Sequence, residues 1–122
     1  DIMRLELNGG TVQFLKSGAA QSFLFRDGGL KAIGGQAFPA GILAECTPDV
    51  SELKLFDGDV LLMTSDGVED ATAREILRCN GMNAQDIVTA LGAKALAQRT
   101  GGRRDDITII AAKIFLRDEN EK

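Results

Sequence analysis

The chain contains no histidine, no tryptophan and no tyrosine. The absence of histidine excludes the Ser-His-Asp and Cys-His types of nucleophilic catalysis within this chain, and it also excludes zinc sites that are built on histidine. Any catalysis by these residues must therefore rest on carboxylates, lysine, arginine or a metal-bound water.

Cysteine is also scarce, with only Cys46 and Cys79 among the 122 residues. The two lie far apart and lack the spacing of zinc ligands, which favours free thiols in a reducing cytosol over a disulfide scaffold. No apolar run is long enough to span a bilayer. These features predict a cytoplasmic domain, and a membrane anchor elsewhere in a longer parent protein is compatible with them.

The charge balance is mildly acidic, with a formal net charge of −4. Such a chain offers no basic surface for nucleic acid or for an anionic membrane. Its length suits a single domain. Because the chain opens at Asp1 inside apparent strand sequence, without a targeting segment, we interpret residues 1–122 as part of one domain of a longer protein.

The first half of the sequence has the alternation of apolar residues that is typical of β-strands. This alternation flanks Asn8-Gly9-Gly10 and again Asp27-Gly28-Gly29, and turns of this composition predict hairpins. Pro39 interrupts the pattern and predicts a loop. The solid apolar run from Val60 to Met63 then predicts a central strand that is covered on both faces.

Two helices are predicted in the second half. Thr72-Ala73-Arg74-Glu75 has the capping-box pattern, which predicts a short helix that starts at Thr72 and ends near Gly81. Asn83 can cap a longer helix that ends before Gly101-Gly102. An apolar strand, ITIIAAKIFL, and a charged tail complete the chain. The face of the longer helix that is expected in the core consists of Ile87, Val88, Leu91, Ala95 and Leu96.

Acidic residues gather at the ends of two apolar strands. Asp66 follows the run that ends at Met63, whereas Asp105 and Asp106 precede the last strand. If these strands are antiparallel neighbours, both acidic groups meet at one edge of the sheet. Oxygen ligands of this kind suit Mg²⁺ or Mn²⁺, and Gly67 would let a backbone group or a water approach closely.

Simpler interpretations of the same residues stay open at this point. Asp-Gly pairs are common turns, which is all that we expect of Asp27-Gly28 and Asp57-Gly58. Glu69 and Asp70 suit the N-terminus of a helix, where negative charge is favourable. Asp105-Asp106 and the preceding Arg103-Arg104 could form a loop of mutually compensating surface charge.

Two stretches, DGDVLLMTSDGVED and further on GGRRDDITIIAAKI, resemble the C-terminal half of the bacterial metal-dependent PP2C-type (PPM) serine/threonine phosphatases. The upstream stretches MRLELNGGTVQFLKSGAAQSFLF and FPAGIL resemble the subgroup of the sporulation stage II protein E phosphatase and its stress-response relatives. The resemblance runs over essentially the whole chain. It implies an α+β fold, an antiparallel β-sandwich flanked by helices (α-β-β-α), of which residues 1–122 form the C-terminal part.

The resemblance also implies a centre of two Mn²⁺ or Mg²⁺ ions in the complete domain. Carried over residue by residue, Asp66 and Asp105 match aspartates that are metal ligands in the family. Asp106 falls where the family often has asparagine, so Asp106 and Gly67 are given supporting roles. The Asp-Gly-Met-Gly type of motif, which supplies the bridging aspartate, is absent from this sequence. We therefore expect little or no catalysis from these 122 residues alone.

The implied reaction is the hydrolysis of phosphoserine on an anti-sigma-factor antagonist protein by a metal-activated water. Arg103 and Arg104 could help to dock the phosphate, although solvated loop charges explain them as well. One alternative is a catalytically silent module of the same fold that binds a protein partner, and another is a domain that binds a single cation. Uncovered strand edges and an uncovered apolar face further predict self-association of the fragment.

Overall fold

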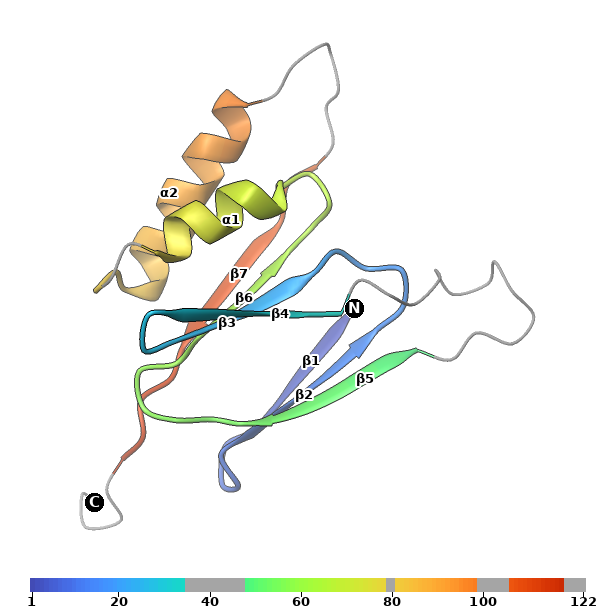
Figure 1. Ribbon diagram of the computed structural model, residues 1–122, viewed down its shortest axis with the longest axis vertical. Coiled ribbons are helices and arrows are strands. Elements are labelled where there is room, and N and C mark those ends of the chain that lie inside the picture. Colours follow the sequence, from blue (N-terminus) through green and yellow to red (C-terminus); the bar gives the residue numbers. More distant parts are fainter. Residues whose placement is uncertain (35–47, 79–80, 99–105, 118–122) are drawn as a thin grey trace.

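The computed structural model describes residues 1–34, 48–78, 81–98 and 106–117. These residues form two antiparallel β-sheets that share a core, and two helices pack against one of the sheets (Figure 1). The strand order is β1-β2-β5 in the three-stranded sheet and β4-β3-β6-β7 in the four-stranded sheet. The elements are β1 (Ile2–Glu6), β2 (Thr11–Lys16), β3 (Ser22–Arg26), β4 (Gly29–Ile33), β5 (Asp49–Lys54), β6 (Val60–Thr64), α1 (Asp70–Leu77), α2 (Ala84–Ala97) and β7 (Ile109–Lys113). The predicted α+β fold with antiparallel sheets is confirmed.

Both predicted hairpins are present. Strands β1 and β2 pair across the turn that contains Gly10, which has a φ of +63°. Strands β3 and β4 pair across Asp27 and Gly28, whose φ values are +48° and +78°. Two consecutive positive φ values characterise a type I′ turn, which suits the twist of a two-residue hairpin and favours Asp-Gly. The loop predicted at Pro39 lies outside the described residues.

Strand β6 is the central strand that the apolar run predicts. It pairs with β3 on one side and with β7 on the other. Val60 and Leu62 pack in a core with the two helices, whereas Leu61 packs in a second core with the three-stranded sheet. Because successive side chains of a strand point to opposite faces, only a strand covered on both sides has a continuous apolar sequence.

The start of α1 differs from the prediction. The backbone N–H of Ala73 already donates to the carbonyl of Glu69, at 3.1 Å, so the helix begins at Asp70 and Thr72 lies inside its first turn. The capping box predicted from Thr72 is therefore wrong, and α1 also ends at Leu77 rather than near Gly81. Asp70 occupies the first turn, as expected for a charge that is favourable there.

Helix α2 follows the prediction more closely. Asn83 is its N-cap, and its side-chain oxygen accepts a hydrogen bond from the backbone N–H of Asp86 at 2.8 Å. Ile87, Leu91 and Ala95 are buried, but the predicted core position of Leu96 is wrong, because 56% of this residue is exposed. No helix within the described ranges is long and apolar enough to cross a bilayer.

A buried ion pair links the four-stranded sheet to the chain that leaves β5. Asp59 is only 1% exposed, and its two carboxylate oxygens accept from Nε and Nη2 of Arg26, each at 2.8 Å. The backbone N–H of Phe56 donates to the same carboxylate at 2.8 Å, and the Arg26 guanidinium lies over the Phe56 ring. Gly58 has a φ of +84°, so the predicted Asp57-Gly58 turn is present. The structural role of Asp59, by contrast, was not predicted.

Lys16 forms a second buried link between the sheets. Its ammonium donates to Asp1 and to the hydroxyl of Ser22, both at 2.8 Å. Burial lowers the pKa of Lys16, and the charge of Asp49 opposes this effect. Gly34 has a φ of +83°, and a Cβ at this position would overlap the Lys16 side chain. Glycine at position 34 is therefore required both by the backbone and by the space that Lys16 fills.

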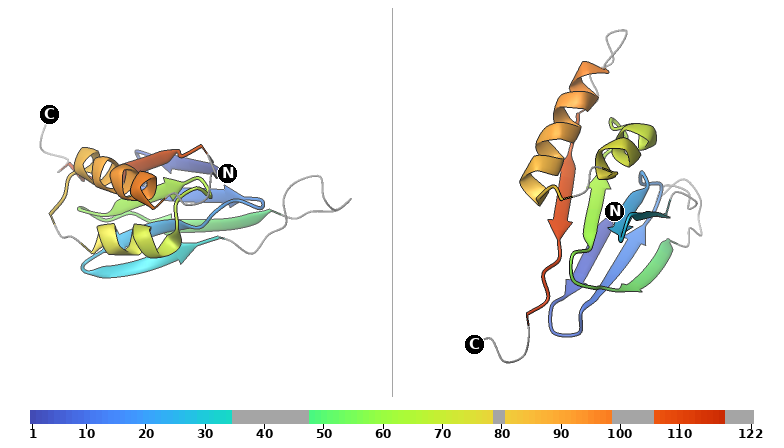
Figure 2. Two further views of the ribbon diagram at one scale, coloured as in Figure 1. Left: turned by 90° about the horizontal axis from the view of Figure 1, so that it is seen from above. Right: turned by 60° about the vertical axis from the view of Figure 1, so that its left-hand side comes forward.

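The outer face of the three-stranded sheet carries an exposed apolar row. Ile2 pairs with Leu15, and Leu15 pairs with Val50, so that the three side chains lie side by side on one face. They are 57%, 38% and 54% exposed. Figure 2 shows that α1 and α2 lie on the side of the four-stranded sheet, away from β1, β2 and β5. No described helix covers the apolar row.

Candidate metal-binding edge

The end of β6 and the start of β7 lie side by side. The two strands are antiparallel and Thr64 pairs with Ile109. The residues that follow β6 are therefore next to the residues that precede β7. The two acidic groups were predicted to meet only if these strands are antiparallel neighbours. Strands β6 and β7 are such a pair.

Ser65 joins the two stretches directly. Its backbone N–H donates to the carbonyl of Thr108 at 2.9 Å, and its hydroxyl accepts from the backbone N–H of Thr108 at 2.9 Å. The same hydroxyl donates to the carbonyl of Asp106 at 3.2 Å. One serine thus fixes the chain before Asp66 against the start of the last strand. Ser65 was not among the predicted site residues, although its place directly before Asp66 was a usable signal.

Asp66 projects from a turn that is anchored on both sides. The carbonyl of Ser65 accepts from the backbone N–H of Val68 at 3.2 Å, and the Val68 side chain is buried in the core beneath the helices. Asp66 itself is exposed, and it has no hydrogen-bond partner among the residues that the structure describes. Gly67 is not among the glycines with positive φ, so its predicted role beside a ligand stays a prediction. An exposed carboxylate that has no partner within the described part of the chain, on a turn held by hydrogen bonds, is available to bind a cation.

The second predicted ligand lies outside the described residues. Asp105, together with Arg103 and Arg104, is in this part of the chain. Asp106 is described and exposed, and its backbone carbonyl accepts the Ser65 hydroxyl. Within the described ranges, no three potential ligands of the Asp, Glu and Cys type come together. The structure therefore brings Asp66 close to the Asp106 backbone, and the ligand role of Asp105 stays a prediction.

An open groove runs beside this edge, between α2 and β7. It has a volume of about 520 Å³, and its walls include Leu96 on α2, Asp106, and Ile107 and Ile109 at the start of the last strand. The exposed position of Leu96 is explained by this groove, because Leu96 lines it instead of packing in the core.

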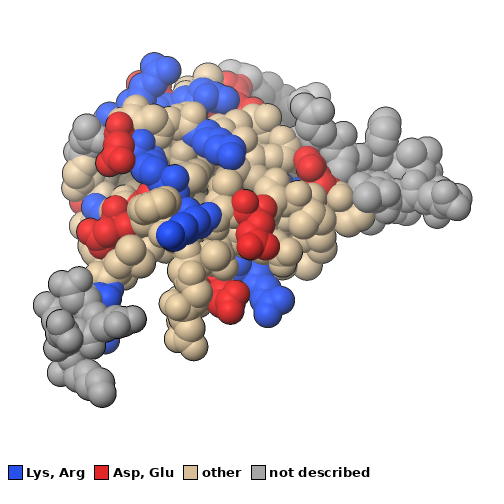
Figure 3. Space-filling model, turned by 60° about the horizontal axis from the view of Figure 1, so that its bottom comes forward, with Lys and Arg blue, Asp and Glu red and all other residues tan. Residues whose placement is uncertain are grey.

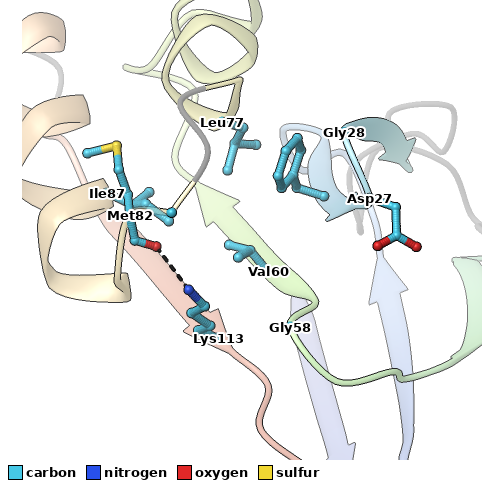
Figure 4. Close-up of a pocket in the computed structure, with 10 residues that line it drawn as sticks. Asp27, Gly28, Gly58, Val60, Leu77, Met82, Ile87 and Lys113 are labelled. Carbon is cyan, nitrogen blue, oxygen red and sulfur yellow. Dashed lines mark hydrogen bonds between the residues drawn. The ribbon is translucent and has the colours of Figure 1, made fainter.

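A different cavity lies at the opposite end of β6. It has a volume of about 400 Å³ and is lined by Val60, Leu77, Met82, Ile87 and Lys113, among others. Lys113 donates to the carbonyl of Met82 at 3.4 Å (Figure 4). Since Val60 begins β6 and Asp66 follows its end, this cavity is not part of the predicted metal site.

Charges of both signs share the surface. On the face that Figure 3 shows, lysine and arginine side chains are interspersed with aspartate and glutamate. The observation agrees with the acidic net charge of the chain.

Comparison with known proteins identifies the family. The family model described as "Stage II sporulation protein E (SpoIIE)" matches residues 1–115. Stage II sporulation protein E of Bacillus subtilis is 26% identical over 124 residues, which cover 93% of this chain but only 15% of that protein. The solved PP2C phosphatase domain of the same protein, with a fragment of its regulatory domain, superimposes with a TM-score of 0.78 at 27% identity, over 92% of this chain and 36% of that one.

A more distant structure shares the fold. The catalytic domain of the serine/threonine protein phosphatase PstP, described in complex with two manganese ions, has a TM-score of 0.68 at 22% identity, over 93% of this chain and 56% of that chain. The sequence resemblance to the PP2C-type phosphatases is confirmed by these matches. This chain belongs to the stage II sporulation protein E family.

Proposed function

We propose that this chain carries part of the metal centre of a PP2C-type protein serine/threonine phosphatase. The observation that carries this proposal is the set of three hydrogen bonds made by Ser65, which joins the Asp66 turn to the stretch before β7. Asp66 and the backbone of Asp106, which are far apart in the sequence, are thereby held at one edge of a sheet. The match to a solved PP2C phosphatase domain supports the assignment.

The residues present suit a hard divalent cation. Asp66 offers an exposed carboxylate without a described partner, and carboxylate oxygens are preferred by Mn²⁺ and Mg²⁺. We assign ligand roles to Asp66 and Asp105, and supporting roles to Gly67 and Asp106. Two ions are expected in the complete domain, as the description of PstP with two manganese ions supports.

The chain contributes position and charge to the reaction. Metal ions held by these carboxylates would supply an activated water as the nucleophile. Asp66 has its carboxylate at this edge, the ligand role of Asp105 is part of the proposal, and Ser65 holds the Asp66 turn against Asp106 and Thr108. No histidine or cysteine nucleophile is required, in agreement with a chain that lacks histidine.

We assign the substrate to the class of phosphorylated anti-sigma-factor antagonist proteins. The resemblance to the sporulation subgroup supports this choice, and so does the openness of the site. Asp66 and Asp106 are exposed at a sheet edge rather than enclosed in a cavity, and an open edge admits a phosphoserine that projects from a folded protein. Such a partner places the domain in the cytoplasm, whether or not the parent protein has a membrane anchor.

The test compares the full-length protein with the 122-residue chain. We expect Mn²⁺-dependent release of phosphate from a phosphoserine protein by the full-length form, and none above background by the 122 residues alone. The reason is that two aspartates hold hydrated ions weakly without the bridging carboxylate. Turnover by the isolated chain would contradict the predicted need for further ligands, and an inactive full-length protein would contradict the phosphatase assignment.

The second candidate is a module of the same fold that binds a protein partner without catalysis. The lack of a three-ligand group within the described ranges favours it. Calorimetric titration of the full-length protein with Mn²⁺ separates the two candidates, because a silent module would show no saturable binding.

We also propose that the isolated chain associates with itself through the apolar row of Ile2, Leu15 and Val50. These side chains are adjacent and exposed on the outer face of the three-stranded sheet, and a continuous apolar patch favours association. Light scattering of the 122 residues is expected to show dimers or larger species, and Leu15→Lys is expected to reduce them. A monomer at all concentrations would contradict the proposal.

A further inference from the structure

A row of three paired strand residues forms the floor of the cavity at the start of β6. Phe25 on β3 pairs with Val60 on β6, and Val60 pairs with Lys113 on β7. Directly paired residues have their side chains on the same face of a sheet, and Val60 packs in the core beneath the helices. All three side chains therefore lie on the helix side of the four-stranded sheet, where they line the cavity.

The helices supply an apolar roof. Leu77 is the last residue of α1, Met82 precedes α2, and Ile87 lies in the first turn of α2, and all three line the cavity. Leu77 and Ile87 are buried in the same core as Val60, so these walls are fixed by the packing of the domain. The cavity of about 400 Å³ is consequently formed before any ligand binds, as is usual for pockets that take small molecules.

Three glycines border the open side of the cavity. Gly28 follows β3, Gly58 precedes β6, and Gly81 lies between the two helices. A Cβ added at any of the three would meet no atom within 4 Å apart from its chain neighbours. Bare backbone thus surrounds the opening, which leaves a small molecule a route to the floor.

Opposite charges stand on the two sides of this floor. Lys113 and Asp27 lie to either side of Val60 (Figure 4). A lysine ammonium has three donors, and among the described residues Lys113 uses one of them, in the 3.4 Å bond to the carbonyl of Met82. Two donors are therefore available to an anion beside Lys113, whereas the Asp27 carboxylate disfavours a second negative charge on the other side.

An exposed aromatic ring adjoins the ammonium. Phe115 is 72% exposed, and Nζ of Lys113 lies 5.9 Å from the centre of its ring. Ile114, between the two, packs in the opposite core with the three-stranded sheet, so Phe115 lies on the same side as Lys113. A flat apolar group bound beside Lys113 can stack on this ring.

We propose that this cavity binds a small aromatic carboxylate with a single negative charge. The carboxylate accepts hydrogen bonds from the Lys113 ammonium, and the aromatic body covers Phe25 and Val60. Asp27 selects against a second carboxylate. The site lies at the end of β6 opposite to Asp66, so this inference goes beyond the proposed function and does not depend on it.

The first test measures binding of phenylacetate to the full-length protein by saturation-transfer NMR, with EDTA present so that no metal ion holds the carboxylate. We expect saturable binding with a dissociation constant on the order of 1 mM, because a ligand this small gains limited free energy. Phenylacetamide, which lacks the charge, should bind about tenfold more weakly. Equal affinities for the two would overturn the proposal. So would the lack of saturable phenylacetate binding, the result expected if another segment of the parent protein fills the cavity.

Lys113→Met tests the anion-binding group. This change keeps much of the side-chain length and removes the charge, so phenylacetate should bind about tenfold more weakly, whereas Lys113→Arg should retain binding. The matched control is Lys31→Met, because Lys31 is an exposed lysine on β4 that does not line the cavity. Its phenylacetate affinity should be unchanged, and an equal loss in Lys31→Met and Lys113→Met would contradict the site.

Two further variants leave the core intact. Phe115→Ala changes an exposed residue, and it should weaken phenylacetate binding about threefold through lost stacking. Unchanged affinity in both Phe115→Ala and Lys113→Met would place the binding elsewhere and overturn the proposal.

Asp27→Asn tests the selection for a single charge. Asn-Gly suits the same turn as Asp-Gly, so the hairpin should be retained. Phenylmalonate, which has a second carboxylate, should bind the unmodified protein about threefold more weakly than phenylacetate, as a repulsion between exposed charges allows. Asp27→Asn should remove this difference, and an unchanged difference would refute the role of Asp27.

Discussion

Replacing Asp66 by Asn in the full-length protein is expected to reduce Mn²⁺-dependent phosphoserine hydrolysis by more than about a hundredfold. Loss of a supporting partner alone costs a metal site about ten- to a hundredfold, and Asp66 is assigned as a ligand. The change keeps the size of the side chain and removes its charge. Because Asp66 is exposed and unpaired within the described residues, the fold should be retained, which circular dichroism and thermal melting can verify.

The control for this prediction is Asp70→Asn. Asp70 belongs to the same SDGVED stretch and lies in the first turn of α1. Its charge favours the helix N-terminus, so the variant should lose a little stability and keep its rate. Equal loss of activity in both variants would show that the helix start, rather than a ligand, is at issue. Asp105→Asn is expected to behave as Asp66→Asn does, and a normal rate in either would refute its ligand role.

Replacing Arg26 by Met is expected to lower the free energy of unfolding by about 3 kcal/mol, the cost of removing one partner of a buried ion pair. The Asp59 carboxylate, which is 1% exposed in the unmodified protein, would keep the Phe56 N–H as its one hydrogen-bond donor among the described residues. This loss of free energy is at the low end of the range for buried ion pairs, because a third of the Arg26 side chain is exposed. Urea unfolding followed by circular dichroism measures the change.

Arg4→Met provides the matched control on the three-stranded sheet. Arg4 is an exposed strand residue that pairs with Gln13 on the outer face, so its replacement should change the free energy of unfolding by less than about 0.5 kcal/mol. A second variant, Arg26→Met with Asp59→Leu, should recover part of the lost stability, because it leaves no buried charge. Equal effects of Arg26→Met and Arg4→Met would contradict the importance of the ion pair.

Local chemistry made much of the fold predictable. The Asp27-Gly28 turn has two positive φ values, which few residue pairs other than Asp-Gly and Asn-Gly tolerate. The continuous run from Val60 to Met63 indicated a strand covered on both faces, since an exposed face would have required polar residues. In both cases the cause lies within a few adjacent residues, and therefore it is visible in the sequence.

Features that depend on distant partners were not predictable in the same way. Thr72 was interpreted as a cap because its spacing to Glu75 is that of a capping box, but its hydroxyl bonds to Gln98 on another helix. Asp59 was given no role from the sequence, and its buried position depends on Arg26 from a different hairpin. Neither Gln98 as the partner of Thr72 nor Arg26 as the partner of Asp59 can be identified from the sequence, because both depend on how distant elements pack.

The candidate site shows both situations. The meeting of the two acidic motifs was predicted only on the condition that β6 and β7 are antiparallel neighbours, which the structure confirms. The hydrogen bonds of Ser65 with Asp106 and Thr108 depend on the exact register of these strands, which the apolar pattern does not determine. Asp105 lies outside the described residues, so its role as a ligand is still a prediction.

The buried ammonium of Lys16 makes the folding of this chain a proton-releasing process in alkaline solution. Burial lowers the pKa of Lys16 from its usual 10.5. Between the lowered value and 10.5, the unfolded chain holds a proton that the folded chain has lost. The free energy of unfolding therefore increases with pH across this interval. A side chain enclosed by Asp1 and Ser22 thus links the acidity of the solution to the docking of one sheet on the other.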